Sequence, residues 1–279
     1  MFLLKSARTT AIAGVLAFGS IAGFSTDANA ASANALATIN WGSFNISLIG
    51  EGMELSFDAQ SDTTVATAAS NGVNPFVTAG PNVTPNWNDG SFATAETGNA
   101  NYNGNSTAQT PSLGSENGVF QSESHTVAGK AGWDVDVDSA ATRSLDFTVS
   151  GSGLVVFTVS YSLFAEAGGS DAIANDTASA TAAVTALLRN LTNNATPVGN
   201  STASLSASFD LAALNFGSSA DSASTLAVVM FFNAGDQGRL DISAISSAAT
   251  SSPAAIPLPA AGWLLGASLV MLARRRRVA

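Results

Sequence analysis

The middle of the chain alternates between apolar and polar residues, a period of two that predicts β-strands. Successive side chains of a strand point to opposite faces, so this alternation separates the two faces of a sheet. Residues 39–49 alternate in this way, and one face is expected to hold Ile39, Trp41, Ser43, Asn45, Ser47 and Ile49. Further strands are expected at residues 145–149, 154–163, 225–232 and 239–245. Several strands separated by turns predict an all-β fold, an antiparallel sandwich with a jelly-roll-like arrangement.

Glycine-rich turns separate the later strands. Residues 151–153 read Gly-Ser-Gly and lie between the strands 145–149 and 154–163. A short glycine turn between two alternating segments predicts that they form a hairpin. A second turn, at residues 235–238, precedes the last of the expected strands.

Residues 176–188 are ambiguous between a strand and a helix. Serine or threonine alternates with alanine, as in a strand. Five apolar residues also fall at helical spacing: Ala180, Ala183, Val184, Leu187 and Leu188. Alanine favours a helix, whereas threonine and the surrounding strands favour a sheet. We expect a strand here and keep the helix as the alternative.

Two segments differ in composition from the strands. Residues 59–118 are rich in Asn, Gly, Thr and Ser and contain four prolines. We interpret them as a polar insertion in the sandwich, either with short strands of its own or partly disordered. Residues 246–255 are mostly Ser and Ala, which predicts a flexible tether. The sandwich itself is then expected to span residues 31–245.

The strictest alternation in the chain, at residues 133–138, places three aspartates on one face of a strand and apolar residues on the other. The aspartates are Asp134, Asp136 and Asp138. Their spacing is similar to the start of a calcium-binding loop, but the glycine and glutamate expected further along are missing. We therefore expect a solvated strand face, and a weak calcium site is the alternative.

The first thirty residues predict an export signal. Lys5 and Arg8 form a positive region, and an apolar core follows at residues 11–24. Ala28 and Ala30 occupy the positions of small residues in a cleavage site. We expect the signal peptide, residues 1–30, to be removed, so that the chain is exported through the inner membrane.

The last two dozen residues hold a proline-marked break, an apolar segment and a basic stop. The break consists of Ile256, Pro257, Leu258, Pro259 and Ala260. The apolar segment, residues 261–273, has no charge, and together with the break it reaches roughly 18 residues, the lower limit for a membrane helix. The basic stop consists of Arg274, Arg275, Arg276 and Arg277. These arginines are expected to hold the C-terminus on the cytoplasmic side.

This order of motif, apolar helix and arginine cluster resembles the PEP-CTERM class of bacterial sorting signals, most closely its VPLPA-CTERM variant, with Ile256 in place of valine. The resemblance implies recognition by an exosortase, a membrane-embedded transpeptidase-like protease, and release or transfer of the chain to the cell surface. It also implies an association with exopolysaccharide or biofilm matrix. The two prolines suit a protease substrate, because they remove backbone donors and favour an extended segment. A simple tail anchor is the alternative.

The region between the two terminal signals is strongly acidic. It contains nineteen acidic and four basic residues, a net charge of about −15. Nucleic-acid binding is therefore excluded, since phosphate contacts need clustered Lys and Arg. The chain has no cysteine, so no disulfide and no thiolate metal centre can form. We expect no cofactor.

Candidate residues for catalysis or sugar binding are few. His125 follows Glu123 and Ser124, but neither a nucleophile elbow nor a recognisable carboxylate pair accompanies it. No catalytic residue is therefore expected. Trp87 and Tyr102 are weak candidates for stacking on a sugar ring, and the alternative is that they hold the polar insertion onto the sandwich.

We interpret the chain as an exported, non-enzymatic bacterial cell-surface or extracellular-matrix protein. Before processing it would be held in the membrane by its C-terminal helix, and afterwards it would be at the cell surface or extracellular. Its expected partners are the processing protease and an exopolysaccharide. A carbohydrate-binding surface module and a secreted hydrolase are the alternatives.

Overall fold

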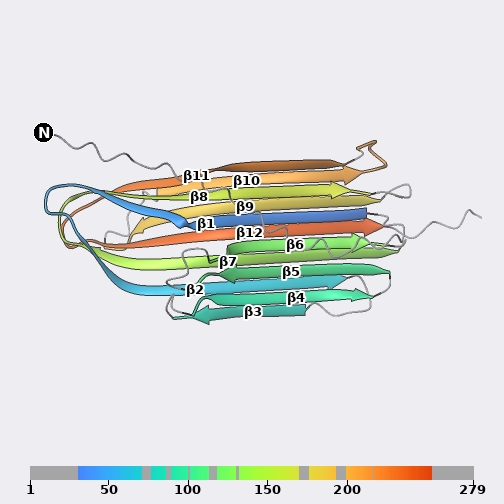
Figure 1. Ribbon diagram of the computed structural model, residues 1–279, viewed down its shortest axis with the longest axis horizontal. Helices are drawn as coiled ribbons and strands as arrows, with labels where there is room; N and C mark the ends of the chain where they lie inside the picture. The colour runs from blue at the N-terminus through green and yellow to red at the C-terminus, as the bar shows by residue number, and fades with distance from the viewer. Residues whose placement is uncertain are drawn as a thin grey trace, which may run out of the picture.

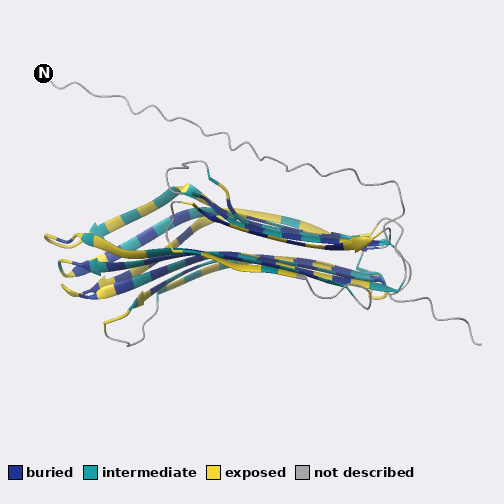
Figure 2. Ribbon diagram, turned by 90° about the horizontal axis from the view of Figure 1, so that it is seen from below, coloured by how far each residue is buried: buried dark blue, intermediate teal, exposed yellow. Residues whose placement is uncertain are grey.

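The computed structural model describes residues 31–70, 77–85, 89–99, 101–112, 118–129, 132–169, 176–192, 199–215 and 217–252. These residues form two antiparallel β-sheets packed face to face (Figure 2). The strands are β1 (Ala31–Ile49), β2 (Leu55–Ser70), β3 (Val77–Thr84), β4 (Ser91–Asn99), β5 (Tyr102–Thr110), β6 (Phe120–Ala128), β7 (Trp133–Val149), β8 (Gly153–Gly168), β9 (Thr177–Asn190), β10 (Gly199–Asp210), β11 (Ser218–Phe232) and β12 (Gln237–Ser252). The predicted all-β antiparallel sandwich is confirmed.

Each sheet has six strands (Figure 1). Sheet A has the strand order β11-β8-β1-β6-β5-β4, and sheet B has the order β10-β9-β12-β7-β2-β3. The described ranges contain no helix that could cross a membrane. The predicted signal peptide and C-terminal helix lie outside the described residues.

Burial follows the period of two along most of the strands. In β7, Val135 and Val137 are buried, whereas Asp134, Asp136 and Asp138 are exposed. The predicted solvated acidic face is therefore confirmed. The same alternation runs through β9, so the strand expected at residues 176–188 is confirmed over the helix.

Three connections at one end of the sandwich pass from one sheet to the other, at the left of Figure 1. They join β1 to β2, β7 to β8, and β11 to β12. The first two are hydrogen-bonded to each other, since the N–H of Ser150 donates to the carbonyl of Glu54 at 3.0 Å. The third joins them through the N–H of Gly235, which donates to the carbonyl of Val149 at 2.7 Å. We call this the crossing end.

The predicted hairpin of residues 145–149 and 154–163 is wrong. β7 lies in sheet B between β12 and β2, whereas β8 lies in sheet A between β11 and β1. The glycines are needed for another reason, because a Cβ added at Gly50 would lie only 2.5 Å from the carbonyl oxygen of Ser152. The β1–β2 and β7–β8 connections thus approach each other so closely that glycine is required. A local glycine turn does not reveal which sheet the next strand joins.

The expected face of residues 39–49 is also wrong beyond Trp41. Asn40 pairs with Ser160 but Asn45 pairs with Thr158, so β1 contains three extra residues at this point. An odd number of extra residues exchanges the two faces of a strand. As a result the side chains that pack against the core after the irregularity are Phe44, Ile46 and Leu48, and Ile49 is exposed.

The segment predicted as a polar insertion is part of both sheets. Within residues 59–118, most of β2 pairs with β7 in sheet B, and β5 pairs with β6 in sheet A. The predicted tether is also shorter than expected, because residues 246–252 continue β12 between β7 and β9. Their Ser and Ala side chains looked like linker residues, but Ser246, Ala248 and Ser252 are fully buried.

The inward-facing side chains change in size along the sandwich. Toward the crossing end they are large, and the ring centroid of Phe147 lies 5.6 Å from that of Phe157 and 5.4 Å from that of Phe232. We call this part the wide half. Toward the opposite end the buried side chains are mostly small, including Ala31, Ala33, Ala35, Ala37, Ser122, Ser124, Ala178, Ala180, Ala182 and Ser246. We call this part the narrow half.

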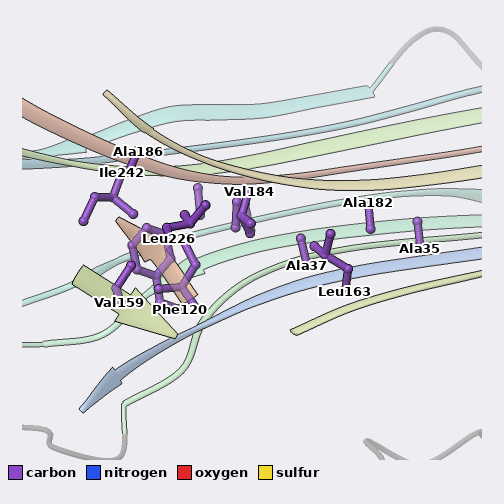
Figure 3. Packing of buried hydrophobic residues seen from close by; sticks show 14 of the residues in the cluster. Ala35, Ala37, Phe120, Val159, Leu163, Ala182, Val184, Ala186, Leu226 and Ile242 are labelled. Carbon is purple, nitrogen blue, oxygen red and sulfur yellow. The ribbon is translucent and has the colours of Figure 1, made fainter. Parts of the chain in front are cut away.

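The pictures agree with this change in side-chain size. Figure 2 shows the two layers close together over the narrow half and spreading apart toward the crossing end. In Figure 3 the short side chains of Ala35, Ala37 and Ala182 lie apart from the larger Phe120 and Leu226. The thickness of the sandwich therefore follows the size of its core residues, as close packing requires.

Both ends of the described domain lie opposite the crossing end, and there the connections β6–β7, β8–β9 and β10–β11 also pass from one sheet to the other. The first residue, Ala31, pairs with Ala128 near the end of sheet A. The last residue, Ser252, pairs with Trp133 and accepts a hydrogen bond from the N–H of Gly132. Because only a short connection separates β6 from β7, the two chain ends leave the sandwich close together.

Candidate functional site

Several of the predicted site residues lie outside the described residues. These are the sorting motif (Ile256, Pro257, Leu258, Pro259 and Ala260), the basic stop (Arg274 to Arg277), the cleavage-site residues Ala28 and Ala30, and Trp87. The site can therefore be built only from the sandwich, where three arrangements of polar side chains are present. They are an acidic hollow on sheet B, a buried ion pair and a buried serine cluster.

The acidic hollow lies on the outer face of sheet B, near the chain ends. Its volume is about 320 Å³, and it is formed by parts of β2, β7, β9 and β12. Asp134 and Asp136 line it, and the hydroxyl of Ser251 donates to Asp134 at 2.5 Å. Partial burial, with a smaller contribution from neighbouring Asp138, raises the pKa of Asp136 above its ordinary value. The hollow is therefore a weakly polar depression with two carboxylates on one wall.

The aspartates of β7 are not arranged as a calcium site. They follow one another at every second position of a strand, so Asp134 and Asp138 are separated by roughly 13 Å along it. Calcium ligands must converge within about 2.6 Å of the ion. No group of three His, Cys, Asp or Glu side chains in the described ranges is placed to hold a metal ion. The weak metal candidates Asp134, Asp136 and Asp138 are thus separate carboxylates on a solvated face.

A buried ion pair joins β7 to β2. The Nε of Arg143 donates to Oδ1 of Asp62 at 2.8 Å, and a terminal guanidinium nitrogen donates to Oδ2 at 2.6 Å. The side chains are only 1% and 0% exposed. This is the two-pronged geometry in which arginine binds carboxylates most tightly. The guanidinium carbon also lies 4.6 Å from the ring centroid of Trp41, within the range of a cation–π contact.

The ion pair is also bonded to sheet A. Thr110 of β5 donates its hydroxyl to Oδ2 of Asp62 at 2.8 Å, and the N–H of Ser91 donates to that hydroxyl oxygen at 2.8 Å. Arg143 further donates to the carbonyl of Pro111. These partners are all protein groups in the interior, so the carboxylate is held in place and sealed from substrate. The network fixes the position of one sheet relative to the other. It contains no reactive group.

Sequence reasoning did not identify this pair, although a signal was present. In β7, Ala141, Leu145 and Phe147 share the buried face, and Arg143 occupies the same face by the period of two. A buried arginine requires an acidic partner. The identity of that partner, Asp62, depends on strand pairing that no local pattern contains.

A cluster of serine hydroxyls connects the sheets in the narrow half. Ser122 of β6 donates to the carbonyl of Ser139 at 2.8 Å, and its hydroxyl oxygen lies 2.9 Å from that of Ser246. Ser124, two residues along the same strand, also lies 2.9 Å from Ser246. A serine side chain is short, so a hydroxyl that reaches the backbone of the facing sheet shows that the sheets are close there. These hydrogen bonds are buried, and each of the three hydroxyls has a partner within the cluster.

Ser124 and His125 lie on opposite faces of β6. Ser124 points into the interior, whereas Glu123 and His125 face outward, because they alternate along β6. Partial burial lowers the pKa of His125 and raises the pKa of Glu123. A base and a nucleophile on opposite faces of one strand cannot reach the same substrate atom.

Tyr102 is buried, which corrects its place as a sugar-stacking candidate. Its side chain is only 2% exposed, and its ring stacks on Trp133 with the centroids 4.5 Å apart. Its hydroxyl accepts a hydrogen bond from Ser70 at 3.0 Å. The ring therefore holds β5 against β7 and β2, which is the alternative that the sequence left open for it.

The chain matches no protein-family model, no curated protein and no solved structure.

Proposed function

We propose that this chain is an exported, non-enzymatic surface or matrix protein whose acidic sandwich is released to the cell surface by an exosortase-like protease. The observation that carries the proposal is the order of proline motif, apolar segment and arginine cluster at residues 256–277. This order combines an extended protease site with a membrane stop. Association with an exopolysaccharide or biofilm matrix belongs to the same proposal and rests on the resemblance of this tail.

The position of the chain ends supports the proposal. β12 ends at Ser252, and the motif begins only four residues later at Ile256. Ala31, the residue that would follow the expected signal cleavage after Ala30, is the first described residue and already belongs to β1. A cut at either end would therefore remove a terminal signal and leave every described strand whole.

The composition of the described sandwich also fits a non-enzymatic role. The buried polar groups of the ion pair and of the serine cluster are hydrogen-bonded to other protein groups, and Asp134, Asp136 and Asp138 are spread along a solvated face. Acidic surfaces keep a protein soluble and oppose its association with other anionic surfaces. A sandwich of this kind is suited to remain folded outside the cell without disulfides.

The proposal is tested by the intact mass of the protein recovered from the surface of cells that carry the processing enzyme. We expect a chain that lacks residues 1–30 and the segment from Trp263 to Ala279. Replacement of both Pro257 and Pro259 by alanine should give an uncleaved form that stays in the membrane. Pro253→Ala, just outside the motif, is the matched control and should be processed normally. A full-length tail in the surface fraction would contradict the proposal.

A further inference from the structure

We propose that the free edge of β11 is a self-association site, where the strand pairs antiparallel with β11 of a second copy of this chain. β11 is the last strand of sheet A, and it pairs only with β8. An edge strand offers unpaired backbone donors and acceptors to another strand unless charges, prolines or irregularities protect it. The second half of β11 has none of these protections.

The unprotected segment is residues 225–232, which read Thr-Leu-Ala-Val-Val-Met-Phe-Phe. It contains no charge, proline or glycine, and its pairing with β8 is regular throughout. Leu226, Val228, Met230 and Phe232 face the core. On the outer face, Val229 is 53% exposed and Phe231 is 56% exposed. Such an apolar edge is unusual in a protein whose exported region has about one acidic residue in twelve.

Apolar side chains continue from the edge onto the outer face of sheet A. Phe231 pairs with Leu154 of β8, which pairs in turn with Ile49 of β1. In the adjacent row, Val229 pairs with Val156. Ile49 is 60% exposed and Leu154 is 37% exposed, so the rows form one exposed patch at the crossing end. We call this the edge patch.

The edge is complementary to itself, which a two-fold interface requires. With the two-fold axis at Val229, each Val229 faces its counterpart in the other copy. Each Phe231 then faces Ala227 of the other copy, so a large side chain meets a small one on the same face. Asp221, the nearest charged residue of β11, remains beyond the paired segment. The two edge patches become continuous across the junction.

The charge of the protein favours this site over the other edges for contact between copies. Two copies that are both strongly acidic repel each other, so they can approach only where no charge is present. β4 carries Glu96 on its edge, and β3 contains Pro81, which has no N–H to donate. The exposed positions of β10 are mostly serine, threonine and asparagine. β4 and β3 also expose one large apolar side chain each, Phe92 and Val83, but among the described edge strands β11 is the one that places two of them, Val229 and Phe231, in a segment without charge, proline or glycine.

The size of the edge patch predicts a weak association. Edge pairing covers part of Val229 and Phe231 on β11 but leaves Leu154 on β8 and Ile49 on β1 largely outside the contact, so the apolar area that it buries is small. A stable interface buries about 800 Å² on each partner. Backbone hydrogen bonds between the two strands would supply part of the remainder. The fraction of dimer is therefore expected to depend on protein concentration.

The absence of cysteine allows a direct test with the full chain. Val229→Cys introduces a single thiol on the proposed two-fold axis, where the two Cα atoms would lie about 5.5 Å apart, within the range of a disulfide. Thr225→Cys is the matched control, since its two copies would be roughly 27 Å apart along the paired strands. Oxidation with a copper–phenanthroline catalyst should cross-link the Val229→Cys chain to twice its mass and leave the Thr225→Cys chain as a monomer.

A second variant separates specific pairing from random collision. When Val229→Cys is combined with Phe231→Lys, most of the cross-linked product should disappear, because a lysine on an edge opposes strand pairing. A far-ultraviolet circular dichroism spectrum like that of the unchanged chain would show that this surface substitution leaves the sheets intact. A monomer after oxidation of Val229→Cys, or equal cross-linking of Val229→Cys and Thr225→Cys, would overturn the proposal. A covalent product of another mass would also overturn it and would identify a different protein as the occupant.

Discussion

The wide and narrow halves of the sandwich share long strands such as β1, β7, β8 and β12 but are packed by different means. In the wide half, aromatic rings such as Phe147, Phe157 and Phe232 fill the space between the sheets. In the narrow half, alanines let the sheets approach, and serine hydroxyls such as those of Ser122 and Ser246 hydrogen-bond across the gap. The difference teaches that the core of this protein is specified by side-chain size at each position, and that polar residues can belong to it when they are small enough to bond to the facing sheet.

The largest effect is expected at the buried ion pair, which lies between the two halves. Asp62→Ala leaves the charge of Arg143 buried without its carboxylate and should lower the free energy of unfolding by about 3–5 kcal/mol. Urea unfolding measures this loss. The double variant Asp62→Ala with Arg143→Met should recover much of it, because no buried charge is then left. No recovery would mean that the hydrogen bonds of the network matter more than the charge.

A slightly smaller loss is expected in the wide half. Phe157→Ala removes a buried ring that contacts Phe147 and should cost about 3–4 kcal/mol, from lost burial and the cavity that remains. Thr158→Ala changes the adjacent, outward-facing position of the same strand and should cost less than about 0.5 kcal/mol. Equal losses in the two variants would show that the ring does not fill the space between the sheets.

The crossing end is expected to show a dependence on pH through Asp236. Its carboxylate accepts hydrogen bonds from the N–H of Asn233 at 2.8 Å and from the side chain of Asn190 at 2.9 Å. The backbone bond from Asn233 contributes most to holding the pKa of Asp236 below its ordinary value of 3.8. The stabilisation is therefore complete above that value and is lost as the pH falls below it toward the folded-state pKa.

Asp236→Ala checks this dependence. It should lower the free energy of unfolding by about 2 kcal/mol at pH 7, since the hydrogen bonds that Asn233 and Asn190 donate to a charged acceptor are removed. The difference between the variant and the unchanged chain should shrink as the pH is lowered from 5 to 3. A difference that stays constant over this range would show that the charge of Asp236 contributes nothing.

In the narrow half, removal of a hydroxyl should have the smallest effect. Ser246→Ala abolishes the bonds to Ser122 and Ser124 and should cost about 1–2 kcal/mol. Ser246→Val should cost more, because it adds volume where the sheets are close as well as removing the bonds. Differential scanning calorimetry of the two variants gives the order. If Ser246→Val were more stable than Ser246→Ala, the space between the sheets would be large enough to hold the added volume.

The sequence predicted the sandwich and the faces of the regular strands, because alternation is a local property. It predicted Val135 inward and Asp136 outward in β7, as the structure shows. It failed where the outcome depends on distant residues. The three extra residues of β1, the passage of residues 150–152 to the other sheet and the burial of Ser246 are each decided by a partner strand. The jelly-roll-like arrangement stays a prediction.

The candidate sites can also be divided into those that a local pattern reveals and those that depend on strand pairing. The burial of Tyr102 depends on its stacking with Trp133, which strand pairing brings about and no local pattern contains. Only one member of the buried ion pair could be inferred from the sequence. Alternation places Arg143 on the buried face, whereas its partner Asp62 follows only from strand pairing. The terminal signals are predicted from local motifs alone, and they stay predictions because they lie outside the described residues.

The most direct test of this account is the free energy of unfolding of Ala182→Leu, measured by urea beside Ala183→Leu. Ala182 is fully buried in the narrow half, whereas its neighbour Ala183 points to the outer face of the same strand. We predict a loss of about 2–3 kcal/mol for Ala182→Leu, because a leucine forces the sheets apart, and a change within about 0.5 kcal/mol for Ala183→Leu. Equal stability of the two variants, or a gain for Ala182→Leu, would contradict the claim that small side chains set the spacing of the sheets.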